Sequence, residues 1–161
     1  MFRVMNIARH LFVGCVLLIC STAAAEARCS QATYDSYLDQ LTAAFPSRFG
    51  SEGPVAKDVA AEIGDKAKWC ASTACKAKDS RGYWEARTVY ALAGTLWAAG
   101  EAANGEFSDA RNSVRRVVAI ANELQQNLPK PVGREFARRM RGMLAKVDAI
   151  AHEGQRRASI H

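Results

Sequence analysis

The sequence predicts an all-α fold, in which about five helices form antiparallel hairpins in one small bundle. Apolar residues recur at helical spacing along nearly the whole chain after residue 30. No stretch alternates apolar and polar residues over a convincing length, and no hairpin turn joins β-rich runs. Only short polar or proline-containing breaks separate the predicted helices, so helices that are neighbours in sequence should be antiparallel.

The first predicted helix begins after Ser30, whose hydroxyl can cap it, and ends at Pro46. Its apolar stripe consists of Tyr34, Leu38, Leu41 and Phe45. The second predicted helix begins at Pro54, because proline suits a first helical position. Its stripe consists of Val55, Val59, Ile63 and Cys70, and we expect the polar residues 71–79 to be broken.

The third predicted helix runs from about Ser80 to Ala103, and its middle, from Val89 to Ala99, is apolar nearly all round. Such a helix is normally the buried centre of a bundle. The turn Asn104-Gly105 separates it from a fourth helix, which Ser108 can cap. The apolar positions of the fourth helix are Ala110, Val114, Val117, Val118, Ala121, Leu124 and Leu128.

A fifth predicted helix follows the break Pro129-Lys130-Pro131 and carries one apolar face. That face consists of Phe136, Met140, Met143, Leu144, Val147, Ile150 and Ala151. On the opposite side, Arg134, Arg138 and Arg141 recur at the spacing i, i+4, i+7.

Basic residues are concentrated in the C-terminal third of the chain. Residues 111–161 hold eleven basic and four acidic residues, whereas residues 26–110 hold nine and twelve. Arginine presents a planar fork of donors that matches phosphate and carboxylate. We therefore expect Arg134, Arg138 and Arg141 to form a basic binding face for a polyanion or an acidic partner, with a merely solvated helix surface as the alternative.

The first residues have the layout of a cleavable export signal. Arg3 and Arg9 precede a short apolar core, residues 11–20, and small residues follow up to Ala25. The core is shorter than the roughly 20 residues that span a bilayer. We therefore expect residues 1–25 to be removed by cleavage after Ala25, with cleavage after Ala27 as the alternative. Residues 26–161 should form a single exported domain, and we expect it in a bacterial periplasm.

Cleavage would leave three cysteines, Cys29, Cys70 and Cys75. An oxidising compartment favours one disulfide and one remaining thiol. If the first two helices pack antiparallel, Cys29 lies near the end of the second helix, where Cys70 and Cys75 are found. We expect Cys29 to be bridged to one of these two; a local Cys70–Cys75 bridge is the alternative.

No motif of the chain predicts an enzyme, a metal site or a cofactor. His152-Glu153 begins like a zinc-protease helix, but the position of the second histidine is Arg156. The mature chain contains neither G-x-S-x-G nor S-x-x-K, and it lacks C-x-x-C-H. Pairs of carboxylates one helical turn apart, Asp35 with Asp39 and Asp58 with Glu62, leave an enzyme without a recognisable motif as an open alternative.

Small residues, a phenylalanine and a glycine turn mark the region where the third and fourth predicted helices meet: Ala98, Gly105, Phe107 and Ala110. With these residues, the segment 83–122 resembles a single tetratricopeptide-type hairpin. The chain departs from the family pattern at Glu101, where a tyrosine is usual, and at Asn122, where proline is frequent. The resemblance implies a helical hairpin and protein binding.

These observations favour a binding protein over an enzyme. The first hypothesis is an exported adaptor, chaperone or inhibitor that contacts another envelope protein through a helical groove. The alternative is an envelope-associated binder of polyanions, such as anionic lipid, lipopolysaccharide or nucleic acid, acting through the C-terminal arginines. Neither hypothesis involves a cofactor.

Overall fold

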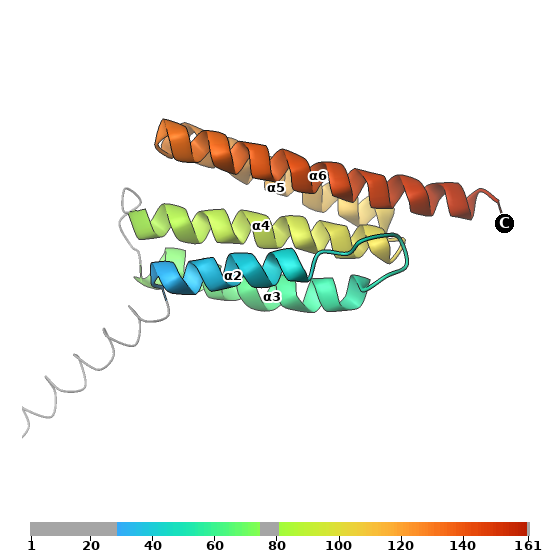
Figure 1. Cartoon of the computed structure of the whole chain (residues 1–161), viewed down its shortest axis with the longest axis horizontal. Helices are drawn as coiled ribbons and strands as arrows, with labels where there is room; N and C mark the ends of the chain where they lie inside the picture. Colours follow the sequence, from blue (N-terminus) through green and yellow to red (C-terminus); the bar gives the residue numbers. More distant parts are fainter. Residues whose placement is uncertain (1–28, 75–80, 161) are drawn as a thin grey trace, which may run out of the picture.

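A computed structural model of the chain describes residues 29–74 and 81–160, which form α-helices and one short π-helix, with no strand among them. The predicted all-α bundle is therefore confirmed (Figure 1). The predicted export signal lies outside the described residues. The elements are α2 (Gln31–Ala43), α3 (Gly53–Trp69), η1 (Cys70–Ala74), α4 (Arg81–Ala103), α5 (Phe107–Asn127) and α6 (Lys130–Ala158).

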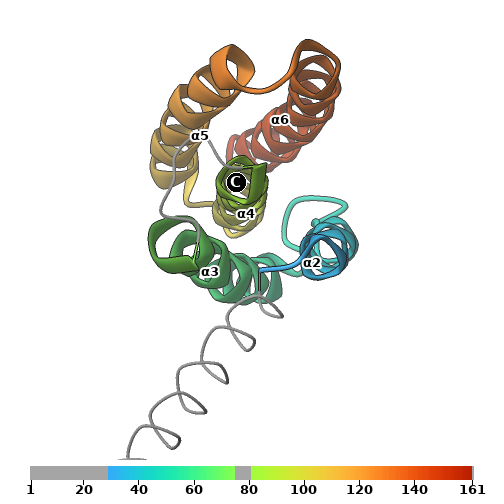
Figure 2. The same cartoon turned by 90° about the vertical axis from the view of Figure 1, so that its left-hand side faces the viewer.

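Helix α4 is the buried centre of the bundle, as its apolar sequence predicts. Seen end-on in Figure 2, α2 and α3 lie on one side of α4, and α5 and α6 lie on the other. Leu92 and Leu96 are buried in the middle of α4, and every residue from Ala98 to Ala103 is buried. A helix of this composition can be covered from several sides because it carries few charged groups that need water.

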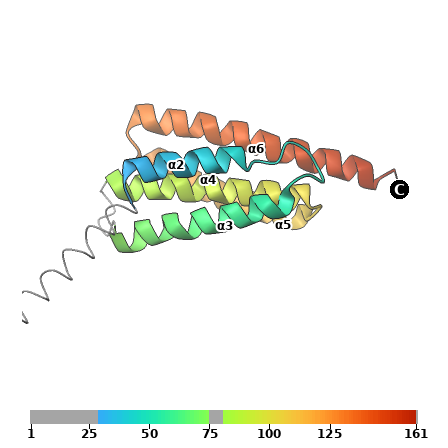
Figure 3. The same cartoon turned by 60° about the horizontal axis from the view of Figure 1, so that its bottom comes forward.

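Successive helices run antiparallel. Figures 1 and 3 show α2, α4 and α6 pointing one way and α3 and α5 pointing the other. The connections between α4 and α5 and between α5 and α6 are short, so each helix packs against the next one along the chain. Helices α2 and α6, which are distant in sequence, do not pack closely along their lengths.

The buried stripe of α3 differs from the predicted one. Val55 is 58% exposed and Val59 is only partly buried, whereas Ala56, Ala60 and Ala67 are buried together with Ile63. The small residues face α4 because they let the two helix backbones come close. The predicted stripe is therefore confirmed at Ile63 and Cys70, which are both 1% exposed, and wrong at Val55.

Two helix ends also differ from the prediction. Residues Cys70–Ala74 are not broken but continue α3 as a π-helix. Helix α5 begins at Phe107, with Glu106 rather than Ser108 at the N-cap and no side-chain cap bond. The Glu106 amide donates to the Glu101 carbonyl at 2.9 Å, which closes the turn and starts the helix before Ser108.

A disulfide joins Cys29 to Cys70, with the two Cα atoms 5.8 Å apart. The bridge connects the residue that precedes α2 to the end of α3. Of the pairings left open by the sequence, this one brings the two ends together as the antiparallel arrangement predicts. Cys75 lies outside the described residues.

The connection between α2 and α3 is fixed to the far end of α6. The Phe49 ring stacks against that of Phe107, with centroids 6.0 Å apart, and both contact the position of Gly154. The Phe49 amide donates to Glu153 Oε2 at 3.1 Å. This connection therefore ties the first helical pair to α5 and α6, and it closes one end of the bundle.

Candidate functional site

A hollow surface lies between α2 and α6 in the described part of the chain, and α4 forms the floor of two of its three parts. It consists of three adjoining spaces of about 700, 400 and 450 Å³. Leu38 lines all three, and Thr88 and Val132 line the first two. Because they share lining residues, these spaces adjoin one another, and we call them together the α2–α6 groove.

The α2–α6 groove arises because α2 and α6 both pack on α4 without closing on each other. The end-on view in Figure 2 shows the two helices on the same flank of the molecule. Tyr34 and Leu41 of α2 turn inward and are buried, as are Phe136 and Met140 of α6. Neighbouring side chains on the outer edge of each helix, such as Leu38 on α2 and Val132 on α6, line the groove.

The surface of the groove is mainly apolar. Val132 is 53% exposed, and Leu38 and Trp84 are half-buried. Phe45 and Met143, also half-buried, line the end of the groove farthest from Trp84. Apolar side chains that are open to water along a continuous concave surface indicate a binding site more strongly than single exposed apolar residues do.

Charged side chains form the rims of the groove. Four of these charged side chains pair with each other on the protein surface: Arg81 with Glu85, and Arg138 with Glu135. Three other charged residues line the hollow near Phe45, with Asp39 on α2 and Arg139 and Lys146 on α6. No salt bridge joins these three within the described residues, although the α2 rim is acidic and the α6 rim is basic.

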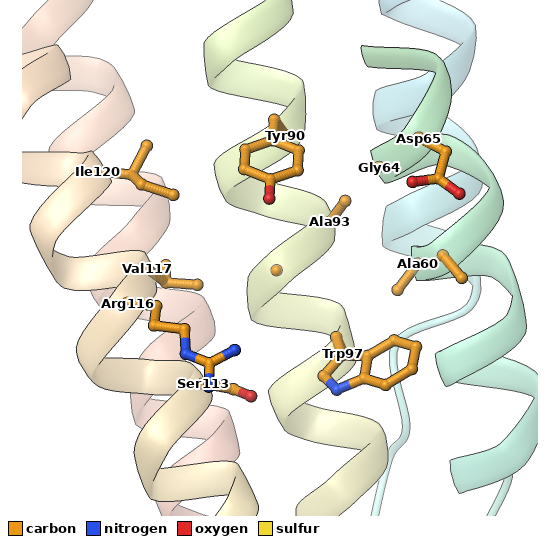
Figure 4. A pocket seen from close by; sticks show the side chains of 12 residues that line it. Ala60, Gly64, Asp65, Tyr90, Ala93, Trp97, Ser113, Arg116, Val117 and Ile120 are labelled. Carbon is orange, nitrogen blue, oxygen red and sulfur yellow. The ribbon is translucent and has the colours of Figure 1, made fainter. Parts of the chain in front are cut away.

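A smaller hollow of about 250 Å³ lies on the opposite flank of α4, between α3 and α5 (Figure 4). Tyr90 and Trp97 rise from α4 two helical turns apart, and the short side chains between them form the floor. Asp65 on α3 and Arg116 on α5 stand at the two edges. This space is smaller than any of the three that form the α2–α6 groove.

Trp97, at one end of this smaller hollow, is held by a polar network. Its Nε1 donates to Glu101 Oε1 at 2.6 Å, and Lys57 Nζ lies 5.2 Å from its ring centroid. Lys57 also pairs with Glu106 at 2.8 Å, and this hydrogen bond lowers the pKa of Glu106. Glu101 is only 6% exposed, and its Oε2 has no hydrogen-bond partner among the described residues. The network orients the indole, so we regard it as structural.

The three arginines singled out in the sequence are exposed on α6. Arg134 and Arg141 make no salt bridge within the described residues, whereas Arg138 donates to both carboxylate oxygens of Glu135. Phe136 and Met140, on the opposite side of the helix, are buried. The arginines therefore share a solvent-facing surface of α6, but one of them is already paired.

The described residues contain no cluster of three or more histidine, cysteine or acidic side chains that could hold a metal ion. His152 is exposed on α6, next to Glu153, which is bound to Phe49. Among the same residues, no helix combines the length and the hydropathy needed to cross a bilayer.

Comparison of the chain with protein-family models, with curated proteins and with solved structures finds no match. The candidate site therefore depends on the geometry alone.

Sequence reasoning missed the α2–α6 groove because its residues look like ordinary core positions. Leu38 fits the apolar stripe of its helix as well as the buried Leu41 does. One signal was available: Val132 lies directly after a proline break and one helical turn before Phe136, on the same face of α6. Val132 is exposed, and Trp84 and Leu128 line the same hollow, so an apolar surface is open to solvent there.

Proposed function

We propose that the chain is an exported helical binding protein that receives a segment of another protein in the α2–α6 groove. The observation that carries this proposal is the row of three mainly apolar hollows between Trp84 and Phe45, which share lining residues and lie open between α2 and α6. A chain of this size gains stability by burying apolar surface, so an open apolar channel is expected where a partner supplies the cover.

Two further observations support the proposal. The Cys29–Cys70 disulfide suits a protein that works in an oxidising compartment, in agreement with the export signal expected from the sequence. The groove is also held open by the rest of the fold, because the disulfide anchors the start of α2 and Phe49 anchors the connection that follows it. A largely preformed site loses little conformational freedom on binding.

The proposal can be tested by site-specific photo-crosslinking in the producing cell. A benzophenone amino acid at Val132 should give an adduct with one partner protein, and the adduct should disappear when Leu38→Glu is added. Val55 offers a matched control, because it is a valine of similar exposure, 58% against 53%, on α3. Adducts of equal yield from both positions, or none from either, would contradict the proposal. Circular dichroism verifies that Leu38→Glu remains helical.

A second candidate function is polyanion binding by α6. The observation in its favour is that Arg134 and Arg141 are exposed and make no salt bridge within the described residues. Such a surface would bind anionic lipid, lipopolysaccharide or nucleic acid through charge, and its affinity would fall steeply with salt. Crosslinking at Val132 should persist at high salt, which separates the two functions.

A further inference from the structure

We infer that the segment bound in the α2–α6 groove is an amphipathic α-helix of about four turns, with acidic residues along the edge that faces α6. This inference rests on the proposed function and specifies the partner for that same site.

The walls of the groove favour a helical partner. Helices α2, α4 and α6 satisfy their own backbone groups through internal hydrogen bonds, so they offer no strand edge to which an extended peptide could pair. An extended peptide would place its own N–H and C=O groups against Leu38, Val132 and Phe136 without partners, and that is costly. A helix brings its hydrogen bonds with it and presents only side chains.

The length of the groove sets the length of that helix. Its α6 wall extends from Val132 to Lys146, which is about 14 residue steps, or roughly 21 Å at 1.5 Å per residue. Its α2 wall extends from Gln31 to Thr42, and Phe45 lines the groove just beyond the end of that helix. A partner helix of about four turns would cover the apolar surface from Trp84 to Met143, with anchors repeating at i, i+4, i+7 and i+11.

The charges on the two rims predict which edge of the partner helix is acidic and which is basic. Arg139 and Lys146 are seven residues apart, which places them two turns apart on the groove side of α6. The α2 rim carries Asp39. Carboxylates seven residues apart on one edge of the partner would face both cations, and a lysine or arginine on its other edge would face Asp39. Such rim pairs contribute to specificity and association rate more than to affinity.

The other charged residues of the groove do not alter this pattern. Arg81 and Glu85 neutralise each other at one end, and Glu135 is occupied by Arg138. The cations without a salt bridge within the described part of the groove are therefore those on the α6 rim, Arg139 and Lys146. The Lys146 ammonium lies 5.6 Å from the centroid of the Phe45 ring, which leaves its charge unneutralised.

The test is a selection of displayed random peptides that bind residues 26–161 with the disulfide intact. Each peptide is long enough to form about five helical turns. Peptides that also bind Val132→Glu are removed. We expect the enriched sequences to carry apolar residues at helical spacing with Asp or Glu on one edge. Synthetic versions should become helical on binding, as seen by circular dichroism.

Charge reversal tests the acidic edge. The double variant Arg139→Glu/Lys146→Glu should weaken the selected peptides about tenfold, and exchange of their acidic residues for lysine should restore binding to that variant. The exposed pair Arg111→Glu/Arg115→Glu on α5 changes the net charge equally and should leave affinity unchanged.

A selection that yields no peptide sensitive to Val132→Glu overturns the proposed function as well. Sensitive peptides that are extended, proline-rich or basic overturn only the present inference.

Discussion

At the scale of single residues, Glu153 connects two parts of the fold, α6 and the segment between α2 and α3. Its carboxylate accepts the Phe49 amide and pairs with Arg157. The hydrogen bond from Phe49 is the main reason that the pKa of Glu153 lies below its ordinary value of 4.5, and the neighbouring arginines lower it further. The connection between α2 and α3 is therefore tied to α6 through a titratable group.

Acidification should weaken this tie. Because the pKa of Glu153 is lower in the folded than in the unfolded chain, the unfolded chain binds more protons in the range just below 4.5. The contribution of Glu153 to stability is complete above that range and is lost as the pH falls through the folded pKa. We expect Glu153→Gln to lower the Tm at neutral pH, with the difference from the parent shrinking toward about pH 3. A difference that stayed constant with pH would contradict this role.

Gly154 marks a site where the packing leaves no room for a side chain. A Cβ there would overlap the Phe49 ring and lie 2.7 Å from Cζ of Phe107. We expect Gly154→Ala to lower the free energy of unfolding by about 1–3 kcal/mol. Gly142, on the same helix, has open space around it, so Gly142→Ala should raise stability by up to about 1 kcal/mol through helix propensity. Urea denaturation measures both variants, and equal effects would refute the packing argument.

At the scale of elements, α2 depends most on connections outside the helix itself. It packs against α4 and only sparsely against α3, and it buries Tyr34 and Leu41. The Cys29–Cys70 bridge holds its start, and the anchored connection at Phe49 follows its end. Since α2 is one wall of the groove, the state of the bridge should also decide whether the groove keeps its shape.

Removal of the bridge should therefore loosen α2 more than the rest of the bundle. Cys29→Ser/Cys70→Ser should cost about 3–4 kcal/mol of stability by the loop-entropy estimate. Amide hydrogen exchange should become faster in α2 than in α4, because the buried centre keeps its own packing. Cys75→Ser, which leaves the bridge intact, is the control. Exchange that accelerated uniformly along the chain would argue against an independent role for α2.

At the scale of the whole molecule, charge is distributed unevenly along the chain. Residues 111–161, which include α6, are strongly basic, whereas residues 26–110 are slightly acidic. Expected cleavage after Ala25 lowers the net charge from +6 to +4 without altering this distribution. Long-range attraction should therefore bring acidic partners to the α5 and α6 side of the bundle.

If the arginine face binds polyanions, reversal of its unpaired members should be visible on a heparin column. Arg134→Glu/Arg141→Glu should elute at lower salt than the parent, because each lost contact reduces the electrostatic attraction. The exposed residues Arg48 and Lys68 provide a control pair of equal charge change at a distance from that face. Equal elution shifts for both pairs would show that only net charge matters. The Tm should be nearly unchanged, because Arg134 and Arg141 are exposed and exposed charges contribute little to the stability of the fold.

The sequence by itself determined the helical class, the central position of α4 and the closeness of Cys29 to the end of α3. These properties follow from spacing along one helix or from the packing of two successive helices, and such local rules can be applied to a sequence directly.

Only the tertiary structure decided which side chains remain uncovered. Leu38 and Leu41 look equivalent in the sequence, yet one lines the groove and the other is buried. Similarly, the small residues of α3, rather than Val55, face α4. The reason is that burial depends on which helices lie on each flank of α4. The spacing between α2 and α6, which are far apart in the chain, is set by the packing of both against α4 and by the anchors at Cys29 and Phe49.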